Sequence, residues 1–596
     1  MGLECRVKFE DEATNYDNTL YVLPRYGEVM DGIMSRIGFP AGAHIRVLEL
    51  GCGTGTLIQK ILAGWPNAIV HAVDFSTAML KIAGNKIGQD PRVHFIEEDI
   101  FEINENDLPY FDIVVSTFVL HNYEDANQYH IIFAKSINLL SAGGKLIYGD
   151  LIKCVDTDQQ ISERQIQEES MRNNNLTEEE ITHWFELLDE EDSPLPVETI
   201  GGFLKEASFT LIEHQQMGMT AVFSATRPLD LLQVKAELLI CGIRESDNIT
   251  EIFRRQNPDG IPKSGNNGIF LTLNGKIEVL TSFLHTKNQS SPYSLHDKEG
   301  QYYLSKYDKN LNISVDAGNF PDWYYKKVGS WSFPGFFVLE GERYLHLAYK
   351  CCAYNDEERC RFCSVNRREN NDCQDKSVDD ICAVLEGMLS ENLIPSDYHF
   401  CLGGGTYLPV SENVEFFRKI IVCIRKYRSK ESGANPIWIE MIPPSREEIQ
   451  KLIAAGATSF GFNIEVFDDA LRQKFCPGKN KTASIDRYIE AFGTVNALLG
   501  PNKIGSCIIS GLDKQAMLKK GIDMLIQHRT FPCVLPLKIF NGTNMNLGED
   551  VLSLLERDFI SLSRYAADKV KGSGIDVRQN EGCMLCPCCT IIHDLL

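Results

Sequence analysis

Long apolar runs are absent from this chain of 596 residues, since no stretch of 18 consecutive apolar residues occurs in it. A helix that crosses a bilayer needs about 20 such residues. The opening segment, MGLECRVKFEDEA, is too charged to contain the apolar core of a secretion signal. We therefore expect a cytoplasmic protein with no membrane partner.

Basic residues are scarce in the first third of the chain. Residues 1–228 hold 36 acidic and 16 basic side chains, whereas residues 229–596 hold 46 and 43. Nucleic-acid binding requires Lys and Arg side chains that displace counterions from the phosphates. A nucleic acid is therefore an unfavourable partner for this third, and a small-molecule substrate is expected.

Cysteine is scarce in the first half and abundant in the second, where 15 of the 19 cysteines lie between residues 351 and 596. In a protein that is not secreted, such enrichment indicates metal or redox chemistry more than disulfides. We find no internal repeat and no low-complexity tract. At about 100 to 200 residues per domain, the length predicts about three units.

Residues 46–57 (RVLELGCGTGTL) are typical of a buried strand, a glycine-rich turn and the start of a helix. Glycines allow the backbone of such a turn to approach a nucleotide-like ligand closely. Asp74 ends a second predicted strand, where a carboxylate can accept both hydroxyls of a ribose. Glu49 precedes the first glycine by two residues and favours a cationic cofactor over a pyrophosphate. The three glycines are Gly51, Gly53 and Gly55.

Further strands are predicted at residues 69–73, 93–96 and 111–116. With them, residues 9–228 resemble class I S-adenosylmethionine-dependent methyltransferases, most closely the small-molecule and uridine-carboxymethylating branch. The resemblance implies a Rossmann-like fold, the three glycines beside the methionine part of the cofactor, and Asp74 on its ribose. It also implies Asp99 and Ile100 at the adenine. His121 is a candidate general base for the methyl acceptor, or alternatively polar lining.

Residues 177–191 (TEEEITHWFELLDEE) predict a helix that begins with a capping box formed by Thr177 and Glu180. Its apolar face could cover a substrate cavity or serve only for packing. Residues 229–340 predict a small β-rich region or a decorated linker, to which the sequence assigns no chemistry.

A cysteine-rich loop follows the predicted strand at residues 344–349. It contains Cys351, Cys352, Cys360 and Cys363. Three thiolates on one loop suit a [4Fe-4S] cluster and leave its fourth iron open to a ligand. A zinc site is the alternative, because two nearby thiolate pairs can be tetrahedral ligands.

The loop resembles the C-x3-C-x2-C signature of the radical S-adenosylmethionine superfamily, with Phe362 before the last cysteine. The first interval here is seven or eight residues long, which leaves open whether Cys351 or Cys352 is the first ligand. Strands and helices alternate over residues 340–565, as in the biotin-synthase-like branch, and predict a partial (β/α)6 TIM-type barrel. The resemblance implies that a glycine-rich segment meets the cofactor's amino group and that Glu465 and Arg472 orient its ribose or carboxylate. The segment consists of Gly403, Gly404 and Gly405.

The C-terminal tail contains Cys583, Cys586, Cys588 and Cys589. This density of thiols suits an auxiliary iron-sulfur cluster, zinc or capture of a soft metalloid substrate. A tail without function is the remaining alternative.

The predicted organisation is therefore multidomain α/β. It comprises a methyltransferase domain (1–228), a linker or β-rich region (229–340), a radical barrel (341–565) and a cysteine-rich tail (566–596). The leading hypothesis is a bifunctional enzyme that couples radical chemistry on a small molecule to heteroatom methyl transfer in specialised metabolism. A reducing partner such as flavodoxin or ferredoxin is then expected. The alternatives are 3-amino-3-carboxypropyl transfer with methylation on arsenic or selenium, tRNA modification, and a non-catalytic metal-binding scaffold.

Overall fold

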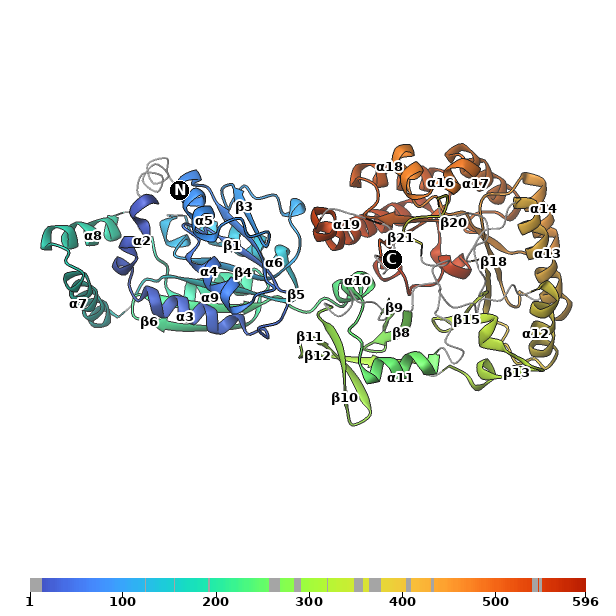
Figure 1. Ribbon diagram of the computed structural model, residues 1–596, viewed down its shortest axis with the longest axis horizontal. Helices are drawn as coiled ribbons and strands as arrows, with labels where there is room; N and C mark the ends of the chain where they lie inside the picture. The colour runs from blue at the N-terminus through green and yellow to red at the C-terminus, as the bar shows by residue number, and fades with distance from the viewer. Residues whose placement is uncertain are drawn as a thin grey trace. The chain divides into compact units, whose positions relative to one another are not determined.

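The computed structural model divides the chain into two compact units, Met1–Asp230 and Leu231–Leu596 (Figure 1). Each unit is described by itself. The further division of the second unit at residues 340 and 565 stays a prediction. The structure describes residues 13–123, 125–154, 156–190, 193–256, 268–282, 291–318, 320–347, 357–363, 377–403, 409–429, 433–538, 545 and 549–596.

The first unit is built on a seven-stranded sheet with the order β3-β2-β1-β4-β5-β7-β6. The first five strands of this order are parallel, and β7 runs antiparallel to both of its neighbours. The predicted strands of this region are confirmed. The strands are β1 (Arg46–Leu50), β2 (Ile69–Asp74), β3 (Val93–Glu97), β4 (Phe111–Thr117), β5 (Leu140–Leu151), β6 (Thr210–Met217) and β7 (Thr220–Thr226).

Helices pack on this sheet, and the central strands are accordingly largely apolar and buried. Val47, Leu48, Val114 and Val115 have no exposed surface. The result is the Rossmann-like fold that was predicted. The helices are α2 (Tyr16–Thr19), α3 (Tyr26–Ile37), α4 (Thr56–Gly64), α5 (Thr77–Ile87), α6 (Ala126–Leu139), α7 (Thr157–Asn173), α8 (Glu178–Glu190) and α9 (Val197–Glu206).

The second unit begins with two helices and a small antiparallel sheet of order β10-β11-β12-β8-β9. These elements lie within residues 229–340, for which the sequence predicted a small β-rich region or a linker. The helices are α10 (Leu231–Cys241) and α11 (Asp247–Gln256). The strands are β8 (Gly268–Leu273), β9 (Ile277–Ser282), β10 (Tyr293–Lys298), β11 (Gln301–Lys306) and β12 (Lys309–Asp316).

The larger sheet of the second unit has its strands in chain order, β15 to β21. Six of them, β16 to β21, are parallel, and β15 pairs antiparallel at the edge. This curled sheet is an open half-barrel, and closure into a complete TIM barrel is not shown. The strands are β15 (Phe337–Glu340), β16 (Tyr344–Leu347), β17 (His399–Leu402), β18 (Ile437–Glu440), β19 (Ser459–Gly461), β20 (Ile504–Ser510) and β21 (Phe531–Pro536).

Helices alternate with these strands and follow the outside of the curve, while the C-terminus lies inside it (Figure 1). A capping box formed by Ser445 and Glu448 begins α14. The helices are α12 (Val378–Ser390), α13 (Val410–Tyr427), α14 (Arg446–Ala455), α15 (Asp469–Phe475), α16 (Pro477–Thr482), α17 (Ile485–Leu499), α18 (Gln515–Gln527), α19 (Glu549–Ser573) and α20 (Ile592–Leu595). Within the described ranges, no helix combines the length and the apolarity needed to cross a membrane.

Candidate functional site

The glycine-rich turn of the first unit connects β1 to α4 at the carboxyl end of the sheet. Gly51, Gly53 and Gly55 have φ values of 74°, 50° and 78°. Residues with a side chain rarely adopt this left-handed backbone conformation. A Cβ at Gly51 would lie 2.4 Å from Cγ2 of Val119. Position 51 therefore requires glycine for space as well as for conformation.

Two buried carboxylates flank this turn. Asp74 accepts hydrogen bonds from the backbone N–H groups of Gly53 (2.8 Å) and Ser76 (3.0 Å). Glu49 is buried, and its Oε2 has no hydrogen-bond partner among the described residues. Burial, and then the charge of Asp74, raise the pKa of Glu49 well above its usual value. An unpartnered buried carboxylate fits a cationic ligand, so these residues suit the sulfonium and ammonium charges of S-adenosylmethionine.

The residues predicted at the adenine follow β3. Asp99 accepts a hydrogen bond from the backbone N–H of Phe101 at 3.0 Å. Ile100 is buried in the main apolar cluster of the unit. Because β1, β2 and β3 are parallel neighbours, their carboxyl ends share one edge of the sheet, which is where ligands bind in open α/β folds.

His121 forms a buried pair with Asp150, a residue that the sequence analysis missed. The Nδ1 atom of His121 lies 2.5 Å from Oδ1 of Asp150. The other carboxylate oxygen accepts hydrogen bonds from the Tyr148 hydroxyl and the Leu120 N–H. Asp150 is thereby fixed in one orientation and holds the imidazole with its proton on Nδ1. Nε2 is then the basic site, and it accepts a hydrogen bond from the side-chain amide of Asn122 at 3.1 Å.

Aromatic side chains near the start of the chain belong to the same region. The rings of Tyr26 and Phe118 stack with centroids 5.9 Å apart. Burial, and then the charge of Glu49, raise the pKa of Tyr26 to about 12. Asp17 of α2 accepts a hydrogen bond from the Thr54 hydroxyl at 2.5 Å, which ties α2 to the glycine-rich turn. Single aromatic residues before the first strand carry no sequence pattern that predicts this placement.

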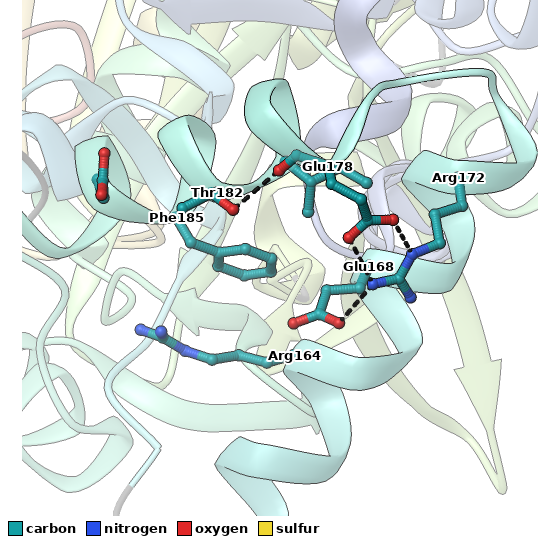
Figure 2. A pocket seen from close by; sticks show the side chains of 8 residues that line it. Arg164, Glu168, Arg172, Glu178, Thr182 and Phe185 are labelled. Carbon is teal, nitrogen blue, oxygen red and sulfur yellow. Dashed lines mark hydrogen bonds and ion pairs between the residues drawn. The ribbon is translucent and has the colours of Figure 1, made fainter.

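The predicted helix at 177–191 is α8, and its capping box is present. Ile181 and Phe185 pack on Met171 of α7 in a small separate cluster. Figure 2 shows the cavity between these helices, whose volume is about 340 Å³. Arg172 of α7 pairs with Glu168 of the same helix at 3.2 Å and with Glu178 of α8 at 2.6 Å. Packing of α8 is thus observed, and its role as a cover for substrate stays a prediction.

Known proteins are similar to this chain over the region of the glycine-rich turn. A family profile described as a methyltransferase domain matches residues 47–144. Malonyl-[acyl-carrier protein] O-methyltransferase 1 from Ilyobacter polytropus is 32% identical over 143 residues, which are 24% of this chain and 49% of that protein. An uncharacterized methyltransferase from Anoxybacillus flavithermus is 32% identical over 154 residues, covering 25% of this chain and 68% of that protein. The chain belongs to the methyltransferases.

The chain spans about half the length of the first of these relatives. Among solved structures, phosphoethanolamine N-methyltransferase 2 from Haemonchus contortus is 18% identical, with a TM-score of 0.28. That match covers 37% of this chain and 60% of the other. The family profile over residues 47–144 and the curated relatives show that the first unit is an S-adenosylmethionine-dependent methyltransferase domain, hereafter the methyltransferase unit.

In the second unit, Cys360 lies beside two residues of the segment after β19. Ligand atoms of Cys360, Glu465 and Cys476 all lie within 4.8 Å of one another. Contact with the Cys476 thiol, followed by burial, raises the pKa of Cys360 well above its usual value. Lys479 forms an ion pair with Glu465 at 2.7 Å. Cys476 was not predicted as a ligand, although Cys-Pro-Gly-Lys at 476–479 was visible in the sequence.

The other predicted residues of the half-barrel have varied surroundings. Cys363 is partly buried on the same loop as Cys360, and its N–H donates to the Cys360 carbonyl at 3.2 Å. A Cβ at Gly403 would lie 2.6 Å from Cβ of Glu440, so this glycine allows β17 and β18 to approach. Arg472 is fully buried over the ring of Tyr488 and donates to the Ala483 carbonyl at 3.0 Å. Four predicted site residues, Cys351, Cys352, Gly404 and Gly405, lie outside the described residues.

The tail is built into the second unit. The N–H of Gly582 donates to Nδ1 of His399 at 3.0 Å, and Leu280 of β9 donates its N–H to the Cys588 carbonyl at 2.9 Å. The Cys588 thiol donates to Glu278 at 3.3 Å. Cys586 and Cys588 are buried, and Cys583 and Cys589 are partly buried. Cys588 therefore packs against the small sheet.

Proposed function

We propose that the methyltransferase unit methylates a heteroatom of a small molecule and that His121 accepts the proton of that heteroatom. S-adenosylmethionine supplies an electrophilic methyl group when it is bound. The observation that carries the proposal is the buried pair of His121 and Asp150, whose side-chain atoms lie 2.5 Å apart. His121 comes two residues after Val119, whose side chain lies against Gly51 of the glycine-rich turn.

The residues of the unit divide the work between binding and proton transfer. Glu49 offers an unpartnered oxygen to the positive charge of the cofactor. The three glycines leave the backbone of the turn accessible to the cofactor. Asp150 keeps the His121 imidazole in the tautomer whose Nε2 can accept a proton. Positioning of the acceptor provides the remaining catalysis, because methyl transfer depends mainly on the alignment of the two reactants.

The test is product profiling with methyl-labelled S-adenosylmethionine and a small-molecule extract, followed by kinetics on the labelled product. A general base contributes about 100-fold or more, so His121→Gln should lower kcat by at least that factor while cofactor affinity is retained. His130→Gln is the matched control, because His130 is a half-exposed histidine of α6 that lies 3.4 Å from a carboxylate oxygen of Glu206 and packs against the ring of Phe203. Unchanged kcat in His121→Gln would contradict the proposal.

We further propose that the second unit holds a [4Fe-4S] cluster and carries out radical chemistry on the same small molecule. Cys360 and Cys363, together with Cys351 or Cys352, would hold the cluster, and a reduced cluster would supply one electron to S-adenosylmethionine. The six parallel strands in chain order support this proposal, as does the loop, which is fixed to α15 by a 2.8 Å bond from the Arg361 N–H to the Phe475 carbonyl.

Anaerobic reconstitution followed by electron paramagnetic resonance tests this second activity. Cys363→Ala should lose the [4Fe-4S]⁺ signal, whereas Cys423→Ala, at a partly buried thiol on α13, should keep it. Cys476→Ala decides whether the observed neighbour of Cys360 is itself a ligand. Product analysis then separates the two ways in which S-adenosylmethionine could be cleaved. 5'-Deoxyadenosine marks formation of a 5'-deoxyadenosyl radical, and 5'-methylthioadenosine marks 3-amino-3-carboxypropyl transfer. The absence of both products after reduction would refute the radical assignment.

A further inference from the structure

Three metal-ligating side chains from distant parts of the second unit meet inside the half-barrel. They are His346 of β16, Cys401 of β17 and Cys583 of the tail, and their ligand atoms all lie within 4.8 Å of one another. His346 and Cys401 are partners in the parallel register, so both side chains leave the same face of the sheet. The thiol of Cys583 lies 4.0 Å from the ring nitrogens of His346.

The spacing of these atoms suits a single ion. Zinc takes sulfur ligands at about 2.3 Å and nitrogen ligands at about 2.0 Å, so tetrahedral donors lie roughly 3.5 to 3.8 Å apart. Side chains within 4.8 Å of one another need to close by only about 1 Å to reach that geometry. An iron-sulfur cluster distributes its ligands over different irons and holds them farther apart than the ligands of one ion.

Two carboxylates surround the three side chains in the manner of a metal site. Oε2 of Glu340 lies 3.4 Å from Nε2 of His346, which leaves Nδ1 to face the ion. Carboxylates in this position fix the tautomer of metal-bound histidines. Oε2 of Glu440 lies 3.9 Å from the Cys583 thiol, and its other oxygen accepts from the amide of Asn463 at 2.9 Å. Asn463 therefore holds Glu440 with one oxygen beside the Cys583 thiol.

We infer that His346, Cys401 and Cys583 bind one zinc ion. Binding releases the two thiol protons, and the two thiolates neutralise the charge of the ion. Soft thiolates with imidazole form a donor set that selects zinc. The ion would fasten the tail to β16 and β17. This inference is independent of the proposed catalytic activities.

The experiment measures zinc, iron and acid-labile sulfide in the full chain after anaerobic purification. The background carries Cys360→Ala and Cys363→Ala, which removes iron bound by that loop from the count. We expect about one zinc per chain, and at least a tenfold loss of zinc in Cys583→Ser and in Cys401→Ser. Cys423→Ser is the matched control and should keep its zinc, since Cys423 lies on α13 and donates to the Cys382 carbonyl at 3.6 Å.

Cobalt substitution keeps the inference testable if a variant fails to fold. Co²⁺ bound by two thiolates gives strong sulfur-to-metal charge-transfer bands in the otherwise unaltered site, and zinc should displace it. Iron and sulfide in place of zinc, a folded chain without zinc, or full zinc content in folded Cys583→Ser would each overturn the inference.

Discussion

Replacement of Gly51 by alanine should destabilise the methyltransferase unit through two separable effects. The first is conformational, because a φ of 74° costs a residue with a side chain about 1 to 2 kcal/mol. The second is steric, because the added Cβ would lie 2.4 Å from Cγ2 of Val119. Overpacking of this kind costs about 1 to 3 kcal/mol. Gly51→Ala should therefore lower the free energy of unfolding of the unit by roughly 2 to 5 kcal/mol.

Gly53→Ala is the matched control for the conformational effect alone. Gly53 also has a positive φ, of 50°, but a Cβ there meets no atom within 4 Å. Its cost should be limited to about 1 to 2 kcal/mol. Val119→Ala removes the methyl group that collides with position 51, so Gly51→Ala in that background should cost about as little as Gly53→Ala.

Hydrogen exchange of peptides from β1 measures the opening free energy of this unit without interference from the other one. A double-mutant cycle over Gly51→Ala and Val119→Ala isolates the steric part. The expected coupling is about 1 to 3 kcal/mol, with the double variant more stable than the sum of the single changes predicts. A coupling below about 0.5 kcal/mol would show that the turn relaxes around the added carbon and would refute the steric argument.

Two further predictions concern buried charges. The raised pKa of Glu49 keeps this carboxyl protonated at pH values above its usual pKa of 4.5. Affinity for the cationic cofactor should therefore increase as the pH rises through the raised pKa and the carboxyl ionises. Calorimetric titration of Glu49→Gln should show no such increase. Lys235 is fully buried and pairs with Asp594 at 2.6 Å, so Lys235→Met should lower the unfolding free energy of the second unit by about 3 to 5 kcal/mol in denaturant titration. Lys426→Met, which removes an exposed pair with Glu386, should cost at most about 1 kcal/mol, and equal costs for the two lysines would contradict the burial argument.

Local patterns predicted the cofactor turn because the features that define it are consecutive in the chain. A strand that is buried on both faces, three spaced glycines and a helix start require one another at short range. The capping box of α8 was predicted for the same reason, since it depends on two residues three positions apart. The placement of Arg472 over Tyr488 was not visible, because the fate of a buried guanidinium depends on distant neighbours.

The sequence by itself determined the parallel strands of both units, the glycine-rich turn and the concentration of thiols in the second half, since each is a pattern of composition or short spacing. Tertiary structure decided which side chains meet. Asp150 reaches His121 because β5 lies beside β4, and Cys583 reaches His346 and Cys401 because the tail returns inside the curve of the sheet. Such pairs are separated by 29 to 237 residues, and only the packing of the whole unit brings them together.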